Sequence, residues 1–499
     1  MTETLVVLLA VLAVGWMLAR RLNPTVVLLV AGTALLVTAP LLGRQEFGRL
    51  TVPETGNAVL DQLAFVAAIF GDRLAGVGLV IMVLFGFSSY MTHVGANDVA
   101  VRLLTGPMLR LRLRYLLVPI VFWVGNLLSL VVPSASSLAV LLMATLYPTM
   151  VAVGLSRLTA GAVIATTATI MPTPLGADNV IAAERLGIDL VDYTFGMHAK
   201  VSIPTLVVIG VVHYFWQRFM DRRDARRALL ASASASEIDA GDARTGAGAA
   251  GAATATGAAP AAGGGGATAT ATVTAAPSTG AQAGPTPPRW YAIMPLLPLL
   301  LVVAPRALAP LGVDVTVSLV PVTLLSLMLV LLVELVRRRD LAAVFEDATV
   351  FVKGMGTGLS TVVGLVIAAG VFVEGITQLG VIDTLADAVQ GASSGTLLLV
   401  LAFVLLMLVL TLLTGGVAPF YSLVELVPRI TASTGINGAL LTLPIQFVGN
   451  LGRAMSPVAA VVIIVAQTIK ATPFQLIART CVPMGVGIVL STVLTLVLL

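Results

Sequence analysis

The sequence predicts an all-α polytopic membrane protein made of two inverted repeats, and three observations support this fold class. Of the 499 residues, 58% are hydrophobic and only 10% are charged, and the mean hydropathy is +1.03, which is too apolar for a soluble domain. A pattern of interrupted apolar segments occurs once in each half of the chain. A segment rich in Ala, Gly, Thr, Ser and Pro separates the two halves.

Several apolar stretches are long enough to cross a bilayer, which takes about 20 residues. They cover residues 4–19, 24–42, 75–94, 155–183, 201–219, 290–311, 315–336, 357–380, 439–468 and 480–499. Two other apolar segments, 115–151 and 396–430, are interrupted near their middles, and their arms are too short to cross twice. We therefore expect each of them to be a re-entrant hairpin that returns to its own side of the membrane.

Each repeat is thus predicted to hold about five spanning helices and one re-entrant hairpin. Because five is odd, the second repeat should run through the membrane in the opposite sense to the first. The repeats are residues 1–220 and 290–499, and residues 221–289 join them. Most of that joining segment is Ala, Gly, Thr, Ser and Pro, which cannot bury a core, so we expect a disordered cytoplasmic linker.

One spanning segment in each repeat is predicted to be a discontinuous helix, 155–183 in the first and 439–468 in the second. The breaks are Pro172-Thr173-Pro174-Leu175-Gly176 and Gly452-Arg453-Ala454-Met455-Ser456, which begin 280 residues apart (452 − 172). The hairpin interruptions, which begin at Pro133 and Leu413, have the same separation. Hydrocarbon cannot satisfy freed backbone groups, so such breaks must lie in protein or line a polar cavity. Matched breaks in two halves point to the binding site of a secondary transporter.

Charge placement predicts the topology, because basic clusters mark the cytoplasmic ends of membrane helices. We place on the cytoplasmic side Arg20-Arg21, Arg110, Arg112, Arg114, residues 218–227, Arg337-Arg338-Arg339, Lys470 and Arg479. The opposite side then receives Glu46, Glu54, Asp61, Asp72, Asp189, Asp192, Asp383 and Asp387. Both chain ends should face outward. Segments 96–113 and 340–355 have the pattern of amphipathic helices that lie along the membrane surface.

Several classes of chemistry find no support in the sequence. There is no G-x-x-x-x-G-K-[ST] motif for ATP, so an ion gradient, of H+ or Na+, is the expected source of energy and no cofactor is expected. Cys481 is the single cysteine, and the three histidines have no metal-ligand spacing. The net charge of +4 comes from helix ends and predicts topology rather than a nucleic-acid surface.

The four interruptions supply the candidate binding groups. Freed N–H groups and positive helix ends attract anions, whereas freed carbonyls and hydroxyls coordinate cations. The candidate substrate-binding residues are Ser134, Ser136, Ser137, Thr173, Thr414, Gly415, Gly416, Asn450, Arg453 and Ser456. The candidate cation-coupling residues are Ser134, Asp178, Asn179 and Thr414. The alternative is that the small residues allow close helix packing and that Asp178 and Asn179 sit at the outer interface.

Arg453 is the sharpest single candidate, because it falls at mid-depth in a predicted span. An arginine inside a membrane is costly and is functional by default, and its planar fork fits a carboxylate with two hydrogen bonds. The alternative is a structural ion pair with Glu425 or Glu374. His93 and Asp98 follow the third span, where we expect an interfacial cap rather than a proton relay.

At these positions the chain resembles the anaerobic C4-dicarboxylate transporter family of the DcuC type, within the ion-transporter superfamily. The resemblance covers both halves and rests on residues 86–98, 140–148, Ala418-Pro419-Phe420-Tyr421, and Asn450-Leu451-Gly452-Arg453 with Ser456-Pro457. It implies a secondary carrier of succinate, fumarate or malate in the bacterial cytoplasmic (inner) membrane. It further implies a homodimer, in contact with membrane lipid, whose hairpins and broken helices form a transport domain that moves in an elevator-like step.

Two positions depart from the family pattern. Pro133 begins the first hairpin tip where the family usually has a small polar residue, and Val417 lies in the second tip where the pattern carries an Asn. The missing amide at Val417 removes a polar contact and leaves the exact substrate and the second cation site open.

Other functions stay open at this level. A carrier of another organic anion, such as an amino acid, a short fatty acid or an aryl-carboxylate, fits the same breaks. An ion channel or a proton-translocating respiratory subunit fits less well, because the latter should carry a chain of Lys, Glu or His through its spans. An intramembrane enzyme would need a catalytic set within the spans, and none is evident, so we expect no enzyme.

Overall fold

The structure of the protein is a computed structural model. It describes residues 2–20, 22–43, 50, 52, 55–110, 114–132, 134–245, 287–308, 317–380 and 395–499, and the described residues form helices and the segments between them, without a β-strand. The chain forms two units, residues 1–216 with 287–499, and residues 217–286. The first of these contains the candidate site.

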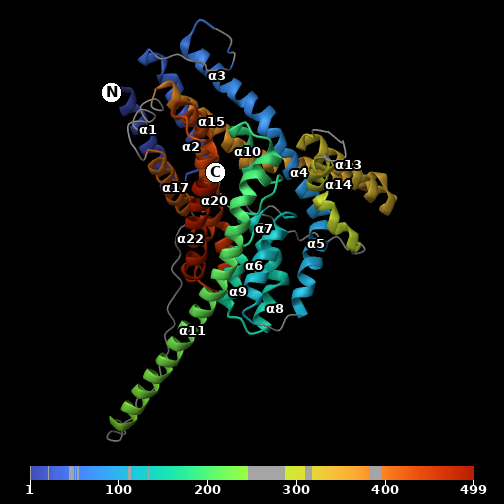
Figure 1. Ribbon diagram of the computed structural model, residues 1–499, viewed down its shortest axis with the longest axis vertical. Helices are drawn as coiled ribbons and strands as arrows, with labels where there is room; N and C mark the ends of the chain where they lie inside the picture. The colour runs from blue at the N-terminus through green and yellow to red at the C-terminus, as the bar shows by residue number, and fades with distance from the viewer. Residues whose placement is uncertain are drawn as a thin grey trace, which may run out of the picture. The chain divides into compact units, whose positions relative to one another are not determined.

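The helices of the first half begin with α1 (Thr2–Ala19) and α2 (Pro24–Thr38), as Figure 1 shows. There follow α3 (Ala58–Arg73), the π-helical segment η2 (Leu74–Gly78), α4 (Leu79–His93), α5 (Ala96–Thr105), η3 (Gly106–Arg110), α6 (Leu117–Leu128), α7 (Ala135–Thr145), α8 (Tyr147–Ala152), α9 (Arg157–Ala165), α10 (Ala177–Leu186), η4 (Asp192–His198) and α11 (Ala199–Thr245).

The second half is likewise helical. Its helices are η5 (Arg289–Leu296), α12 (Leu297–Leu308), α13 (Leu319–Arg338), α14 (Leu341–Gly358), the π-helical η7 (Leu359–Val363), α15 (Gly364–Gln378), α17 (Gly395–Thr414), α18 (Ala418–Leu423), η8 (Val424–Leu426), α19 (Val427–Thr434), α20 (Gly438–Gly452), η9 (Arg453–Met455), α21 (Ala460–Thr468) and α22 (Pro473–Leu498).

Among the described residues, 8 helices are long and apolar enough to cross a membrane. They are Pro24–Leu42, Ala58–His93, Asp192–Arg227, Leu319–Arg338, Leu341–Gln378, Gly395–Thr414, Gly438–Thr468 and Pro473–Leu498. An all-helical chain with this many apolar helices confirms the predicted polytopic membrane protein. The inversion of the second repeat stays a prediction.

Two long helical segments can be compared with the elements that the sequence predicts. α3, η2 and α4 follow one another over 36 residues, but the backbone of Gly76 is not helical (φ −81°, ψ −116°) and marks a kink, so the predicted span 75–94 corresponds to η2 and α4. The predicted surface helix 340–355 is wrong as a separate element, because α14 continues through η7 into α15 as one helix of 38 residues. The polar start of α14 hides this continuity in the sequence, whereas its glycines pack against α4: a Cβ added at Gly354 would lie 2.6 Å from Ser89 Oγ.

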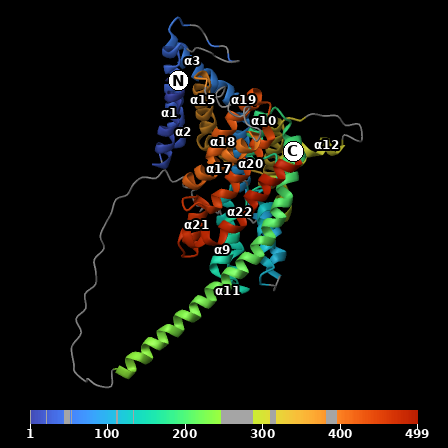
Figure 2. The ribbon, with the colours of Figure 1, turned by 60° about the vertical axis from the view of Figure 1, so that its left-hand side comes forward.

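These two long helices organise the packing of the first unit. α4 packs along α14, α2 packs along α15, and η2 contacts η7. The approach of α2 to α15 is close, since a Cβ added at Gly32 would lie 2.5 Å from the Phe372 nitrogen, as is usual where helices meet in membranes. In a second group, α20 packs against both α17 and α22 (Figures 1 and 2).

The predicted linker begins later than expected. α11 continues to Thr245, so the part of the predicted linker from 221 to 245 is helical rather than disordered. The reason is local: this stretch contains Ala, Leu, Arg and Glu, which favour helix, and between 221 and 227 two aspartates lie among four arginines. Residues 246–286 of the predicted linker lie outside the described residues.

The predicted topology can be tested by accessibility. Arg21, Arg112, Glu46, Glu54, Asp383 and Asp387 lie outside the described residues. In a background with Cys481 replaced by Ser, a cysteine at Arg114 or Arg339 should react with an impermeant maleimide only from the cytoplasm, and one at Asp189 only from outside. Reaction of the cysteine at position 114 from outside would contradict the re-entrant path of the first hairpin.

Candidate functional site

The first hairpin, α6 and α7, is held against the break of the first discontinuous helix. Asn126 on α6 accepts hydrogen bonds with its Oδ1 from the Thr169 nitrogen at 2.9 Å and from Thr169 Oγ1 at 2.8 Å. Asn126 is buried, so this single side chain satisfies a backbone donor that the break sets free. The hairpin and the break are therefore fixed to each other.

The tip of the first hairpin ends in the amino terminus of α7. Ser134 is the N-cap: its Oγ accepts from the Ser137 nitrogen at 3.3 Å and from Ser137 Oγ at 3.1 Å. Ser134 is exposed, while Ser136 and Ser137 are half-buried. The positive end of an 11-residue helix and three hydroxyls therefore lie together at this tip, and Pro133 lies outside the described residues.

The second hairpin, α17 and α18, is held against the second break in the same way. Ser456, fully buried, donates from Oγ to the Leu412 carbonyl at 2.7 Å. Thr414 donates to the Leu410 carbonyl of its own helix at 2.9 Å. Val417 precedes α18 and makes no side-chain capping bond, so this tip is less polar than the first.

Gly415 is required at the second tip for two reasons. Its φ is +75°, and a Cβ added there would lie 2.7 Å from the Ala459 nitrogen. We expect Gly415→Ala to lower thermal stability by about 1–2 kcal/mol and to reduce transport, because the tip can no longer reach the break. Gly416 is a matched control, since its added Cβ meets nothing closer than the Ala418 nitrogen at 3.9 Å. Equal melting temperatures for the two alanine variants would contradict this account.

The first break runs from the end of α9 at Ala165 to the start of α10 at Ala177. Ala168 has a φ of 56°, a left-handed conformation that costs an L-residue about 1–2 kcal/mol. Thr173 is buried; its carbonyl accepts from Asn179 Nδ2 at 2.7 Å, and its Oγ1 accepts from the Leu175 nitrogen at 3.2 Å. Asp178 lies in the first turn of α10, where the helix end favours a negative charge.

The structure brings the two breaks together, although they are far apart in the sequence. Asn450 donates from Nδ2 to Asp178 Oδ2 at 2.7 Å. Gln446, one turn earlier on α20, donates to Asn179 Oδ1 at 2.6 Å and to Asp178 Oδ2 at 3.1 Å. Arg453 donates from its guanidinium to the Ala168 carbonyl. The second discontinuous helix thus contacts both ends of the first break, at Asp178 and Asn179 and at Ala168.

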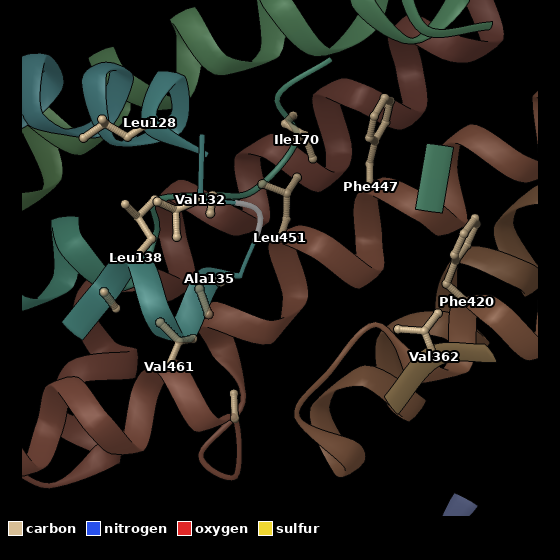
Figure 3. Packing of buried hydrophobic residues seen from close by; sticks show 14 of the residues in the cluster. Leu128, Val132, Ala135, Leu138, Ile170, Val362, Phe420, Phe447, Leu451 and Val461 are labelled. Carbon is tan, nitrogen blue, oxygen red and sulfur yellow. The ribbon is translucent and has the colours of Figure 1, made fainter. Parts of the chain in front are cut away.

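Apolar side chains from the same breaks and from the first hairpin tip pack in one buried cluster. Ile170 from the first break, Leu451 from α20, and Val132 and Ala135 from the tip of the first hairpin belong to one buried cluster (Figure 3). Hydrogen bonds and charges act more strongly where water is excluded. The junction therefore has the low-dielectric setting in which a charged group at the breaks matters most.

Arg453 is not the structural ion-pair partner of either expected carboxylate, so that alternative is wrong. Glu425 is buried and lies 3.0 Å from Arg73 Nη2 and 3.1 Å from Arg185 Nε. Glu374 pairs with Arg429. Among the ion pairs of the described residues, within 4.0 Å, none involves Arg453. Arg453 as a whole is half-buried, and its guanidinium donates to a backbone carbonyl, which leaves other N–H donors for an anion.

Sequence reasoning missed Gln446 and Tyr193. Tyr193, fully buried at the start of η4, donates from its hydroxyl to Gln446 Oε1. Gln446 could have been found, because it precedes Asn450 by one helical turn and is polar in an apolar helix. Tyr193 carried no such signal. His93 lies 2.9 Å from Asp347 and pairs with it. This pair links the end of α4 to α14, and Asp98 has no part in it.

Comparison with known proteins adds independent evidence. The family model described as "C4-dicarboxylate anaerobic carrier", DcuC, matches residues 1–499. An Escherichia coli K12 protein named "Anaerobic C4-dicarboxylate transporter DcuC" is 31% identical over 495 residues, 99% of this chain and 96% of that protein. A Vibrio cholerae protein named "Probable anaerobic C4-dicarboxylate transporter DcuC" is 33% identical over 501 residues, 100% of this chain and 98% of that protein.

One solved structure, of Neisseria gonorrhoeae MtrF, described in its title as illuminating a class of antimetabolite efflux pumps, aligns with 97% of this chain and 96% of its own at 12% identity. The TM-score is 0.49. A likeness of this size carries no argument about the chain.

Proposed function

The chain belongs to the C4-dicarboxylate anaerobic carrier family DcuC, and on that premise we propose that it carries succinate, fumarate and malate in secondary active transport coupled to an ion gradient. Family membership makes it a transporter and not an enzyme, and with its apolar helices makes it a multi-pass protein of the bacterial inner membrane. The substrates, the coupling and the mode of movement are the proposal.

The meeting of the two breaks at Arg453 supports this proposal most directly. A C4-dicarboxylate carries a charge at each end, so its site needs donors from two directions. Arg453 offers a planar fork that matches one carboxylate. The Ser134–Ser137 tip, with the positive end of α7 behind it, offers hydroxyl and N–H donors for the other. Thr173, Thr414, Gly415, Gly416, Asn450 and Ser456 complete the proposed site.

Asp178 and Asn179 are proposed to hold the coupling cation, H+ or Na+, with the hydroxyls of Ser134 and Thr414 at the tips. The Asp178 carboxylate is half-buried and accepts from two amides, of Gln446 and Asn450. A carboxylate near an anionic substrate is costly unless a cation neutralises it. Binding of the cation therefore favours binding of the dicarboxylate, which is the physical basis of symport.

The proposed movement is an elevator-like step within a homodimer in the lipid bilayer, and the hydrogen bonds within the chain support the block that would move. Each hairpin is tied by hydrogen bonds to the break of its own repeat, and the breaks are tied to each other. These elements can move as one block. The long helices Ala58–His93 and Leu341–Gln378 pack along each other through α4 and α14, and we propose that they belong to the scaffold.

Uptake of labelled succinate by purified protein in proteoliposomes tests the function. We expect concentrative uptake that depends on an imposed H+ or Na+ gradient, with fumarate and malate as competitors. Benzoate, butyrate and an amino acid serve as controls, and we expect them not to compete. Competition by one of these controls, without binding of succinate, would replace the proposed substrate by another organic anion.

A further inference from the structure

Four buried polar side chains on η4, α11 and α20 have no role in the site described above. They are Thr194 and His198 on η4, Ser202 on α11 and Thr442 on α20, and each is at most 1% exposed. Within the described part of the chain, Thr194 Oγ1, His198 Nδ1, Ser202 Oγ and Thr442 Oγ1 have no hydrogen-bond partner. One unpaired buried polar atom costs about 1–3 kcal/mol. Four of them in one region therefore indicate an occupant that they bind.

The register of the helices gathers these side chains where two helices meet. Thr194, His198 and Ser202 follow one another at successive turns of η4 and α11, and Thr442 precedes Gln446 by one turn of α20. The two helices touch beside this row: Tyr193 donates to Gln446 Oε1, and the His198 ring stands edge-on to Phe447 with centroids 4.7 Å apart. The row thus begins next to the amides that hold Asp178.

Among the described residues, two charged side chains act in this region, the Asp178 carboxylate and the Arg453 guanidinium, which interact with each other. Asp178 on α10 acts electrostatically on His198. The other groups that face the imidazole are Tyr193, with ring centroids 6.4 Å apart, and the Phe447 ring, while Lys200 on the same helix is exposed. An imidazolium in an apolar surrounding needs a counter-charge, and Asp178 provides it.

The chemistry of the row favours a proton over Na+. A hard cation such as Na+ prefers carboxylate, carbonyl and water oxygens, whereas imidazole nitrogen is a poor ligand for it. Hydroxyl groups both donate and accept, so they suit water molecules that bridge to an imidazole. Buried water commonly makes two to four hydrogen bonds to such unpaired groups. π-helical segments such as η4 are frequent at functional sites.

We propose that His198 and Asp178 form a shared proton site, and that water bridges His198 Nδ1 to the hydroxyls of Thr194, Ser202 and Thr442. The proton enters from bulk water on one side, resides on the imidazole with Asp178 as its counter-charge, and leaves to water on the other side. This inference rests on the proposed function as an ion-coupled carrier, and it makes H+ the coupling ion.

The test compares two buried histidines in proteoliposomes. His198→Gln removes the titratable nitrogen, and His213→Gln is the matched control, because His213 is also fully buried and is held by Thr166 Oγ1 at 3.1 Å. With an internal pH dye, succinate influx should carry protons inward in the unaltered protein and in His213→Gln. His198→Gln should retain succinate counterflow, which needs no net ion movement, and should lose at least about tenfold of its pH-driven accumulation.

Two outcomes overturn the proton site: pH-driven accumulation in His198→Gln equal to that of the control, or accumulation that follows Na+ and ignores pH in the unaltered protein. Absence of succinate counterflow in the unaltered protein would instead refute the proposed substrate. The proton site is then tested by the titration of His198 itself. In purified protein labelled with 15N-histidine, the His198 signals should titrate, and Asp178→Asn should shift that titration. Signals of His198 that do not change between about pH 5 and about pH 9 would refute the site.

Discussion

Arg453→Ala should nearly abolish dicarboxylate transport. In the proposed complex, the guanidinium binds one substrate carboxylate in a site from which water is excluded. Removing one partner of such a contact costs about 2–5 kcal/mol, which is about 30-fold or more in affinity. Arg453→Lys keeps the charge but loses the planar fork, so it should also weaken binding substantially. Binding of labelled succinate to purified protein measures both effects.

The bond from Arg453 to the Ala168 carbonyl requires a control for structure. Arg453→Gln keeps an N–H donor but removes the charge and the fork. It should melt at nearly the temperature of the unaltered protein and yet bind dicarboxylate as weakly as Arg453→Ala. If purified Arg453→Ala binds succinate with normal affinity, Arg453 does not bind the substrate. If Arg453→Gln restores affinity, the residue acts through the Ala168 carbonyl alone.

Asp178→Asn should uncouple transport from the ion gradient. An asparagine Oδ1 can still accept from Gln446 and Asn450, which now bond to Asp178 Oδ2 at 3.1 and 2.7 Å. The change therefore removes the charge and keeps the hydrogen bonds. Without the charge, no cation is needed to neutralise the site. We expect counterflow of succinate to persist and gradient-driven accumulation to fall by at least about tenfold, the equivalent of about 1.4 kcal/mol.

Asp189→Asn is the control for the loss of one negative charge. Asp189 is exposed and accepts from the Val191 nitrogen at 2.9 Å, a bond that asparagine can also accept. The Asp189→Asn variant should accumulate succinate as the unaltered protein does. Full accumulation by Asp178→Asn, with the same dependence on the imposed gradient, would show that Asp178 does not take part in coupling and would return it to a purely structural role between α10 and α20.

The predicted breaks show how far local chemistry determines a membrane protein. Pro172, Pro174 and Gly176 lie in a segment that the structure leaves non-helical between α9 and α10. Gly415 likewise ends α17 with a positive φ. Proline lacks the N–H that a helix needs and glycine accepts backbone angles closed to other residues. These properties belong to single residues, so the sequence alone was sufficient to locate the interruptions.

The partners of the charged and polar residues could not be predicted in the same way. Glu425 was a candidate partner of Arg453, but the structure pairs it with Arg73 and Arg185. Gln446 and Tyr193, which support Asp178 and Asn179, belong to elements that no sequence pattern connects. A carboxylate inside a membrane needs a partner, but which arginine or amide lies within 4 Å depends on how helices far apart in the chain pack.

By itself, the sequence determined the helical membrane fold, the family, the positions of the breaks and the candidate residues Asp178, Asn450 and Arg453, because hydropathy, backbone chemistry and motif order are local properties. Only the tertiary structure decided that the two breaks meet, that Arg453 donates to the Ala168 carbonyl, and that Thr194, His198, Ser202 and Thr442 lie buried without a hydrogen-bond partner among the residues that the structure describes. Those facts depend on contacts between residues up to 285 positions apart, and such contacts are set by the packing of whole helices.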